Sequence, residues 1–239
     1  MTGPSPVTLR WRRIGLLAVL ALVSGVAVKR GDLRIDDRWN PWATLRIADA
    51  PGLLTPFKLS RLDRDRAQCR SVLATADLRF EPVSDRITGE GCGFDNAVRI
   101  TATSAKVGTA FTLSYRAAVS LALWERHSLQ PEARARFGVA VERVEHFGSY
   151  SCRNVYGRTD ARRSRHASAD ALDIAGFVLA DGRRVRVLGD WSGNDDESRF
   201  LAAIHAGACR YFDTVLGPDY NAAHRDHLHL DRGSFGICR

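Results

Sequence analysis

The chain has 239 residues, of which 45% are hydrophobic and 26% are charged, so it is long enough to bury a core and its composition excludes general disorder. The formal net charge of +8 overstates the charge of the folded part, because five basic residues and no acidic residue lie in residues 1–30. The remaining 30 basic and 27 acidic residues give no basic excess of the kind that nucleic-acid binding needs, so we expect no nucleic-acid partner.

The N-terminal segment, residues 1–30, has the pattern of an export signal. Residues 14–28 form an uncharged apolar run, which follows three arginines and precedes Lys29 and Arg30. This pattern favours a signal peptide or a short signal anchor over a buried core helix. The basic residues before the run predict a cytoplasmic N-terminus, with the chain after Arg30 outside the cytoplasm.

Residues 31–57 contain prolines and tryptophans without clear periodicity, so we expect a connector there, followed by one domain over residues 58–239. Apolar spacing and β-branched alternation predict the next elements. In chain order these are a helix over residues 59–76, a glycine-rich turn over residues 89–93, a strand over residues 97–100, a helix over residues 114–127 and a strand over residues 139–147.

The C-terminal part has clearer local signals. Residues 177–187 alternate around Asp181-Gly182 and predict a tight hairpin. Asn194 is the expected cap of a helix that ends by Gly217-Pro218. Residues 226–230 alternate and predict a strand. The order indicates an α+β fold with a small antiparallel sheet flanked by helices.

Histidines cluster near the C-terminus, where three of the seven, His224, His227 and His229, lie within six residues. In a strand His227 and His229 point to the same face. Asp226 and Asp231 lie beside them and suit the support of metal ligands. Two imidazoles on one face, with carboxylates nearby, are typical of a metal site.

A second group lies upstream, in the segment that runs from Ser164 through His166 to Asp173. A loop leading into a strand can bring His166 and Asp173 to one point. With one of the C-terminal histidines they make a three-ligand site, and three protein ligands leave a fourth position open. An open position is the pattern of a catalytic zinc site.

These motifs resemble a known group of metalloproteins. The pattern S-x-H-x-x-G-x-A-x-D followed by H-x-H is the signature of the LAS group, which includes lysostaphin-type endopeptidases, D-alanyl-D-alanine carboxypeptidases and the hedgehog signalling domain. Ser164, His166, Ala171 and Asp173 match, and Ala169 stands where the pattern has glycine. From Gly148 onward the chain is still more similar to the bacterial extensin-like C-terminal domain family, through GSYSCR, SRHASADALDIAGF, VLGPDYNAAHRDHLHLD and the terminal ICR.

The resemblance implies specific roles. His166, Asp173 and His229 would bind Zn²⁺, and His227 would act as general base or as a donor in the transition state. Arg153 would bind substrate, and a surface arginine of an Arg-rich chain is the alternative interpretation. The residues expected to support the ligands or line the cleft are His224, Asp226, Asp231, Ser164 and Trp191, the last of which also fits a core position.

The resemblance also bears on the cysteines. The extensin-like pattern carries a further cysteine about where Tyr115 stands, which leaves Cys152 without a partner. We expect Cys69 to pair with Cys92 and Cys209 with Cys238, since export permits disulfides. No C-x-x-C pair supports a thiolate zinc site.

The function implied is zinc-dependent hydrolysis of amide bonds in peptidoglycan peptides of the cell wall. The expected location is the bacterial inner membrane, crossed once, with the C-terminal domain in the periplasm, or the periplasm itself if the signal is cleaved. Endopeptidase and carboxypeptidase action both stay open, as does the general base. The alternatives are a zinc-containing binding module without catalysis and a structural envelope protein without metal.

Overall fold

The computed structural model describes residues 6–30, 32–33, 35–233 and 236–239. The chain divides into two compact units, Met1–Ala43 and Thr44–Arg239, and each is described by itself. The parts of the predicted export signal and connector at residues 1–5, 31 and 34 lie outside the described residues.

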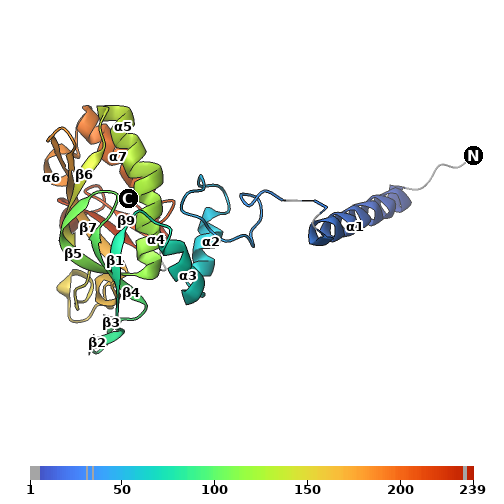
Figure 1. Ribbon diagram of the computed structural model, residues 1–239, viewed down its shortest axis with the longest axis horizontal. Coiled ribbons are helices and arrows are strands. Elements are labelled where there is room, and N and C mark those ends of the chain that lie inside the picture. The colour runs from blue at the N-terminus through green and yellow to red at the C-terminus, as the bar shows by residue number, and fades with distance from the viewer. Residues whose placement is uncertain (1–5, 31, 34, 234–235) are drawn as a thin grey trace, which may run out of the picture. The chain divides into compact units, whose positions relative to one another are not determined.

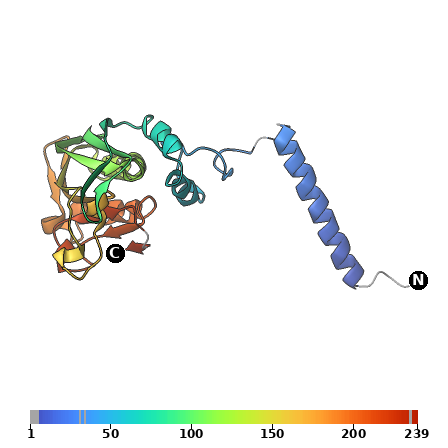
Figure 2. The same cartoon turned by 90° about the horizontal axis from the view of Figure 1, so that it is seen from below.

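The first unit is dominated by one helix, α1 (Pro6–Arg30), which contains the whole apolar run and is drawn as a single rod in Figure 2. Among the described residues, no helix combines the length and the apolar character needed to cross a membrane.

The second unit is built on one sheet, larger than predicted. Among the described residues nine strands join it, in the order β1-β4-β5-β6-β7-β10-β9-β11, with β8 paired to β7. The strands are β1 (Arg79–Val83), β4 (Ala97–Ala102), β5 (Lys106–Ser114), β6 (Val141–Gly148), β7 (Ala171–Leu179), β8 (Arg184–Arg186), β9 (Thr214–Leu216), β10 (Leu228–Asp231) and β11 (Ile237–Cys238). A separate hairpin pairs β2 (Arg86–Gly89) with β3 (Cys92–Phe94).

The mixed α+β class is confirmed, but the predicted small sheet is wrong in size, and the sheet is mainly rather than wholly antiparallel. The pairs β5–β6 and β9–β11 run parallel, and all the other strand pairs described are antiparallel. Strands of two or three residues, such as β9 and β11, are too short to show an alternating pattern. Their pairing depends on neighbours far away in the sequence.

Some helices contact strands of the sheet directly, and others pack on those helices. The helices are α2 (Thr55–Leu62), α3 (Arg66–Leu73), α4 (Tyr115–Trp124), the π-helix η1 (Glu125–Leu129), α5 (Gln130–Phe137), α6 (Val187–Asp190) and α7 (Asp196–Ala208). Figure 1 shows α4 and α5 as a continuous green rod beside α7 in orange. The buried indole of Trp124 donates to the carbonyl of Ile204 at 2.9 Å and packs near Phe177, which joins this rod to α7 and the sheet.

Three predicted helix boundaries are wrong, one of them because α7 ends at Ala208 and not at Gly217-Pro218. The helix expected over residues 59–76 breaks into α2 and α3, because Asp65 turns the chain and its carboxylate caps α3 by accepting the Gln68 N–H at 2.9 Å. Asp195, not Asn194, caps α7 by accepting the Ser198 N–H at 2.8 Å. The predicted hairpin over residues 177–187 is confirmed, with Gly182 at φ 87° in its turn.

Two disulfides are present among the described residues, and one of the two predicted pairs is wrong. Cys209 is bonded to Cys238 as predicted, but Cys92 is bonded to Cys152. Cys69 is a free thiol on the buried face of α3, where burial raises its pKa to about 12. Its helix turns it into the core, whereas the hairpin brings Cys92 to the loop that carries Cys152.

Candidate metal centre

The site forms where two neighbouring strands pair in register. On β10, His229 lies directly opposite Asp173 on β7, so the two side chains share one face of the sheet. Their facing position follows from the antiparallel register that pairs Leu228 with Ile174 and Leu230 with Leu172. The alternating pattern of residues 226–230 therefore has a direct structural consequence, although β10 begins only at Leu228.

The third member, His166, comes from the short 3₁₀ helix η3 (Arg165–Ser168) just before β7. Ser164 caps this turn by accepting the His166 N–H at 3.4 Å. Ala169 ends it in the left-handed region at φ 55°, a conformation that favours glycine, which is the residue the LAS pattern has there. The left-handed residue lets the chain reverse from η3 into β7, so His166 returns toward Asp173.

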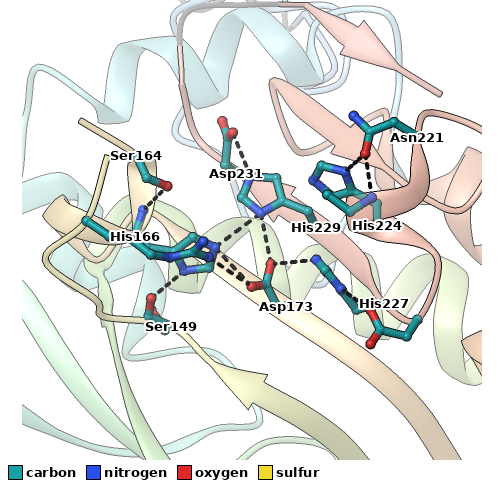
Figure 3. Close-up of polar contacts among 12 residues, drawn as sticks. Ser149, Ser164, His166, Asp173, Asn221, His224, His227, His229 and Asp231 are labelled. Atoms are coloured by element: carbon teal, nitrogen blue, oxygen red, sulfur yellow. Dashed lines mark hydrogen bonds and ion pairs between the residues drawn. The ribbon is translucent and has the colours of Figure 1, made fainter. Parts of the chain in front are cut away.

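The three side chains converge closely, as Figure 3 shows. His166 Nε2 lies 3.2 Å from His229 Nδ1 and 3.1 Å from Asp173 Oδ2, and His229 Nδ1 lies 2.9 Å from Asp173 Oδ1. A tetrahedral zinc ion with ligands at about 2.1 Å holds ligand atoms about 3.4 Å apart. The separations in this cluster fit one small cation.

Hydrogen bonds fix which nitrogens carry protons. The carbonyl of Ser149 faces His166 Nδ1, and the carboxylate of Asp231 lies 3.0 Å from His229 Nε2. Both oxygens accept, so these outer nitrogens donate, and the inner nitrogen of a ring with a single proton turns its lone pair inward. Partners of this kind orient metal-binding histidines in proteins.

The cluster therefore needs a positive charge at its centre. Burial opposes charge on His229, but its hydrogen bonds to Asp173 and Asp231 outweigh burial and raise its pKa to about 9. Burial also opposes ionisation of Asp173, yet the close contacts of His166 and His229 with its carboxylate lower its pKa below the usual range. One proton on His229 leaves His166 Nε2 and Asp173 Oδ2 facing each other as acceptors, whereas a metal ion satisfies all three residues.

His227 and Arg153 stand at the edge of the cluster. His227 Nε2 lies 3.6 Å from Asp173 Oδ1, on the side away from His166 (Figure 3), and its Nδ1 donates to Asp226 at 2.9 Å. Its inward nitrogen is therefore a lone pair beside the cluster. A guanidinium nitrogen of Arg153 lies 3.7 Å from Asp173 Oδ2. Both predicted catalytic residues thus lie next to the predicted ligands.

The cluster opens into a cavity of about 200 Å³. Its lining includes Ser164, His224, Asp231, Arg153, Tyr156 and all three members of the cluster. His224, on the 3₁₀ turn η4 (Ala222–His224), packs its ring 5.8 Å from that of His229, and burial first, then the neighbouring histidines, lower its pKa to about 4. His224 is therefore a neutral wall of the cavity at neutral pH.

Trp191, like Asp226, was expected to support the ligands or line the cleft but lies outside the lining of this cavity. Its indole donates to Asp219 at 3.0 Å and its ring packs 5.5 Å from that of His205, against the core. The core position, which the sequence also allowed, is the one the structure shows.

Sequence reasoning missed the residues that hold the loop of the site. Asp170 is buried and accepts from Arg116 at 2.6 and 2.8 Å, from Ser114 at 2.6 Å and from Ser168 at 2.7 Å. These bonds tie the end of η3 to the start of α4, more than 50 residues earlier. The Ser149 carbonyl was missed as well, because a backbone acceptor leaves no signal in the residue type.

A second group of possible ligand atoms joins His205 with Cys209 and Cys238. The two sulfurs form a disulfide, so neither is the thiolate that binds metal. Among the described residues, the His166–Asp173–His229 cluster is the better metal site.

Fold and site together define a mixed α+β domain with a buried His–Asp–His cluster at the floor of a cavity. The chain belongs to the family described as Extensin-like protein C-terminus, whose model matches residues 67–239 and so includes every residue of the cluster. This confirms the predicted extensin-like membership. No curated protein and no solved structure matches the chain.

Proposed function

We propose that this protein is a zinc-dependent amide hydrolase that acts on cell-wall peptidoglycan peptides outside the cytoplasm. One observation carries the proposal: two histidines, each oriented by an outer hydrogen bond, and one aspartate turn acceptor atoms to one point in an open cavity. Three protein ligands with an open side are the pattern of catalytic zinc, whereas structural zinc has four.

His166, Asp173 and His229 would hold the ion. Zinc supplies Lewis-acid chemistry at such a site, polarising a carbonyl and making water nucleophilic at neutral pH. The same ligand order supports the proposed relationship to the LAS group, which rests on the motif.

His227 suits proton transfer because its chemistry is set by Asp226. The carboxylate holds the proton on Nδ1, which leaves Nε2 as a base beside Asp173, and the Asp226 charge stabilises the ring when it gains a second proton. Arg153 is half-exposed at the same edge and offers a positive charge to a substrate oxygen.

Two features support action outside the cytoplasm. The chain carries two disulfides, which persist in oxidising compartments, and its first 30 residues have the basic–apolar pattern of an export signal. Peptides of the cell wall are the amide substrates of that compartment, and this last step is an analogy with the LAS group.

The test is mass spectrometry of peptidoglycan fragments incubated with the purified full-length chain. With zinc bound, we expect new fragments whose masses show the addition of one water, and chelation should stop their formation until zinc is restored. Stoichiometric zinc without any new fragment would contradict hydrolysis and favour a zinc-containing binding module. A chain that takes up no zinc would leave the structural envelope protein as the better explanation.

A further inference from the structure

Tyr156 has a backbone conformation that ordinary side chains avoid. It lies inside the 3₁₀ turn η2 (Val155–Gly157) at φ 55° and ψ 19°, in the left-handed region. Non-glycine residues in this region are held there by their surroundings and gather at functional sites. The neighbours of Tyr156 must therefore hold its backbone in this unfavourable conformation.

The surroundings of the turn supply the constraint. The Val155 N–H donates to the Arg162 carbonyl at 3.0 Å, and Asn154 Nδ2 donates to the Arg158 carbonyl at 2.7 Å. Just before the turn, Cys152 is bonded to Cys92. The loop is fastened on both sides of Tyr156, and the tyrosine ring, 52% exposed as a residue, is presented to the cavity of the metal cluster.

The direction of the Tyr156 hydroxyl is set by Asn221. Asn221 Oδ1 accepts the Ala223 N–H at 3.0 Å and also faces His224 Nδ1 at 2.9 Å, as Figure 3 shows for His224. A backbone N–H can only donate, so the orientation of this amide is fixed. Its Nδ2 group therefore donates to the Tyr156 hydroxyl oxygen at 2.9 Å.

A phenol oxygen that accepts from Asn221 still has its own proton to give. Tyr156 lines the cavity, and its ring stands edge-on, 6.2 Å from the His224 ring. An oxygen of a molecule in the cavity is an acceptor placed to receive that proton. Donation from Asn221 also polarises the O–H and strengthens it as a donor.

We propose that Tyr156 is a substrate-contacting hydrogen-bond donor, aimed by Asn221 at a carbonyl or carboxylate oxygen of the molecule bound beside the His–Asp–His cluster. The inference rests on the proposed function for the identity of that molecule. In this proposal the strained turn places Tyr156 so that its hydroxyl donates to an oxygen of the substrate. Asn221 is a positioning residue that sets the direction of the Tyr156 O–H bond.

The test uses the full-length, zinc-loaded chain and inorganic phosphate as the oxyanion probe, with its dissociation constant measured by calorimetry. Tyr156→Phe removes only the hydroxyl, so zinc content should be unchanged while phosphate binds about tenfold more weakly. Tyr150→Phe is the matched control, because this loop hydroxyl bonds Thr88 and lies outside the cavity lining, and its phosphate affinity should equal that of the wild type.

Asn221→Asp tests the aiming. The new carboxylate keeps an acceptor for the Ala223 N–H but also accepts from Tyr156, which turns the O–H away from the cavity. Asn221→Asp should weaken phosphate binding about as much as Tyr156→Phe does. The double variant should bind phosphate only slightly more weakly than either single variant. If the fold-changes in phosphate affinity of the two single variants multiply in the double variant, charge repulsion explains the effect of Asn221→Asp. That result would overturn the proposed role of Asn221 in orienting the Tyr156 hydroxyl.

The two proposals fail in different ways. Equal phosphate affinity in wild type and Tyr156→Phe, or a wild type that binds no phosphate, overturns the donor role even if peptidoglycan is hydrolysed. Conversely, a hydroxyl-dependent phosphate affinity in a chain that produces no peptidoglycan fragments keeps the donor role and removes the hydrolase.

Discussion

At the scale of single residues, His227 and His229 are separated by one position and differ in what faces them. His229 turns one nitrogen to Asp231 and the other to the cluster, whereas His227 is bound outward to Asp226 and meets only the edge of Asp173. The two histidines should therefore respond differently to the same substitution.

We expect His229→Ala to lose zinc and activity together, as should His166→Ala and Asp173→Ala, because three ligands leave no redundancy. His227→Ala should keep near-stoichiometric zinc while turnover falls by a factor of about 10²–10⁴, the usual contribution of a positioned acid–base group. Zinc content and turnover are measured on the same preparations.

His224→Ala is the control for this comparison, since His224 lines the cavity without facing the point where the three ligands meet. It should retain its zinc and lose less activity than either neighbour. If His227→Ala released the metal while His229→Ala kept it, the two roles would be exchanged and the ligand set would be wrong.

Glu125 gives a residue-scale prediction that is independent of the metal. It is buried at the start of the π-helix η1, where burial raises its pKa from 4.5 to about 7, although hydrogen bonds from Ser104 and Thr103 partly offset this. The folded state then binds the proton more tightly than the unfolded state. Stability should therefore fall as pH rises from about 4.5 to 7, by about 3 kcal/mol in total.

Glu125→Gln should remove this slope and stabilise the protein above pH 7, with little effect near pH 4. Urea unfolding at pH 5 and pH 8 measures the difference, and Glu81→Gln, on the exposed face of β1, provides the comparison. An unchanged pH dependence in the Glu125 variant would show that its carboxyl is ionised in the folded state.

Much of the cluster was predictable at this scale because its residues carry their own signals. Three histidines within six residues stand out in the sequence, whereas the spacing of His166 and Asp173 is weak evidence alone and gains weight only beside them. Asp170 and Arg116 gave no such signal, because an Asp and an Arg more than 50 residues apart look like ordinary surface charges until the fold joins them.

At the scale of elements, the site depends on the register of β7 and β10 and on the loop from β6 to η3. A shift of one residue on β10 would turn His229 away from Asp173. The loop has no such sheet pairing along its length, and Cys92–Cys152 fastens it to the β2–β3 hairpin. We expect this disulfide to stabilise both the fold and the position of Arg153.

Replacing Cys92 and Cys152 together by serine should lower the free energy of unfolding by about 4 kcal/mol in the chain-entropy model, because the bridge spans 60 residues. Cys69→Ala should cost only about 1 kcal/mol, as for an ordinary small buried side chain. Urea unfolding measures both, and peptide mass mapping tests the pairing. A Cys69–Cys92 peptide would contradict this account.

The elements also show where sequence patterns stop being informative. The hairpin over residues 177–187 carries its turn residues and its alternation locally, so it was predictable. The disulfide partner of Cys92 was not predictable, since the fold and not a local pattern decides which thiol lies beside it. The break between α2 and α3 depends on Asp65. Its side chain caps α3, and this capping conformation prevents one helix from continuing through residue 65.

At the scale of the whole molecule, the sheet, of nine strands among the described residues, places the His–Asp–His cluster on and just before its C-terminal strands, while the N-terminal strands and helices support it. Arg116, Ser114 and Cys92 all come from the first half of the domain and hold a loop of the second. The sheet was predicted too small because its first strands lie far in sequence from the site, and local patterns do not say which strands join one sheet.

The central claim is that His166, Asp173 and His229 form a metal site. X-ray absorption at the zinc edge of the zinc-loaded, full-length chain tests it most directly. The account predicts a coordination shell of nitrogen and oxygen only, with the outer scattering of two imidazoles, which is lost in His229→Ala. A sulfur shell, or zinc that stays bound unchanged in His229→Ala, would place the metal elsewhere and contradict the account.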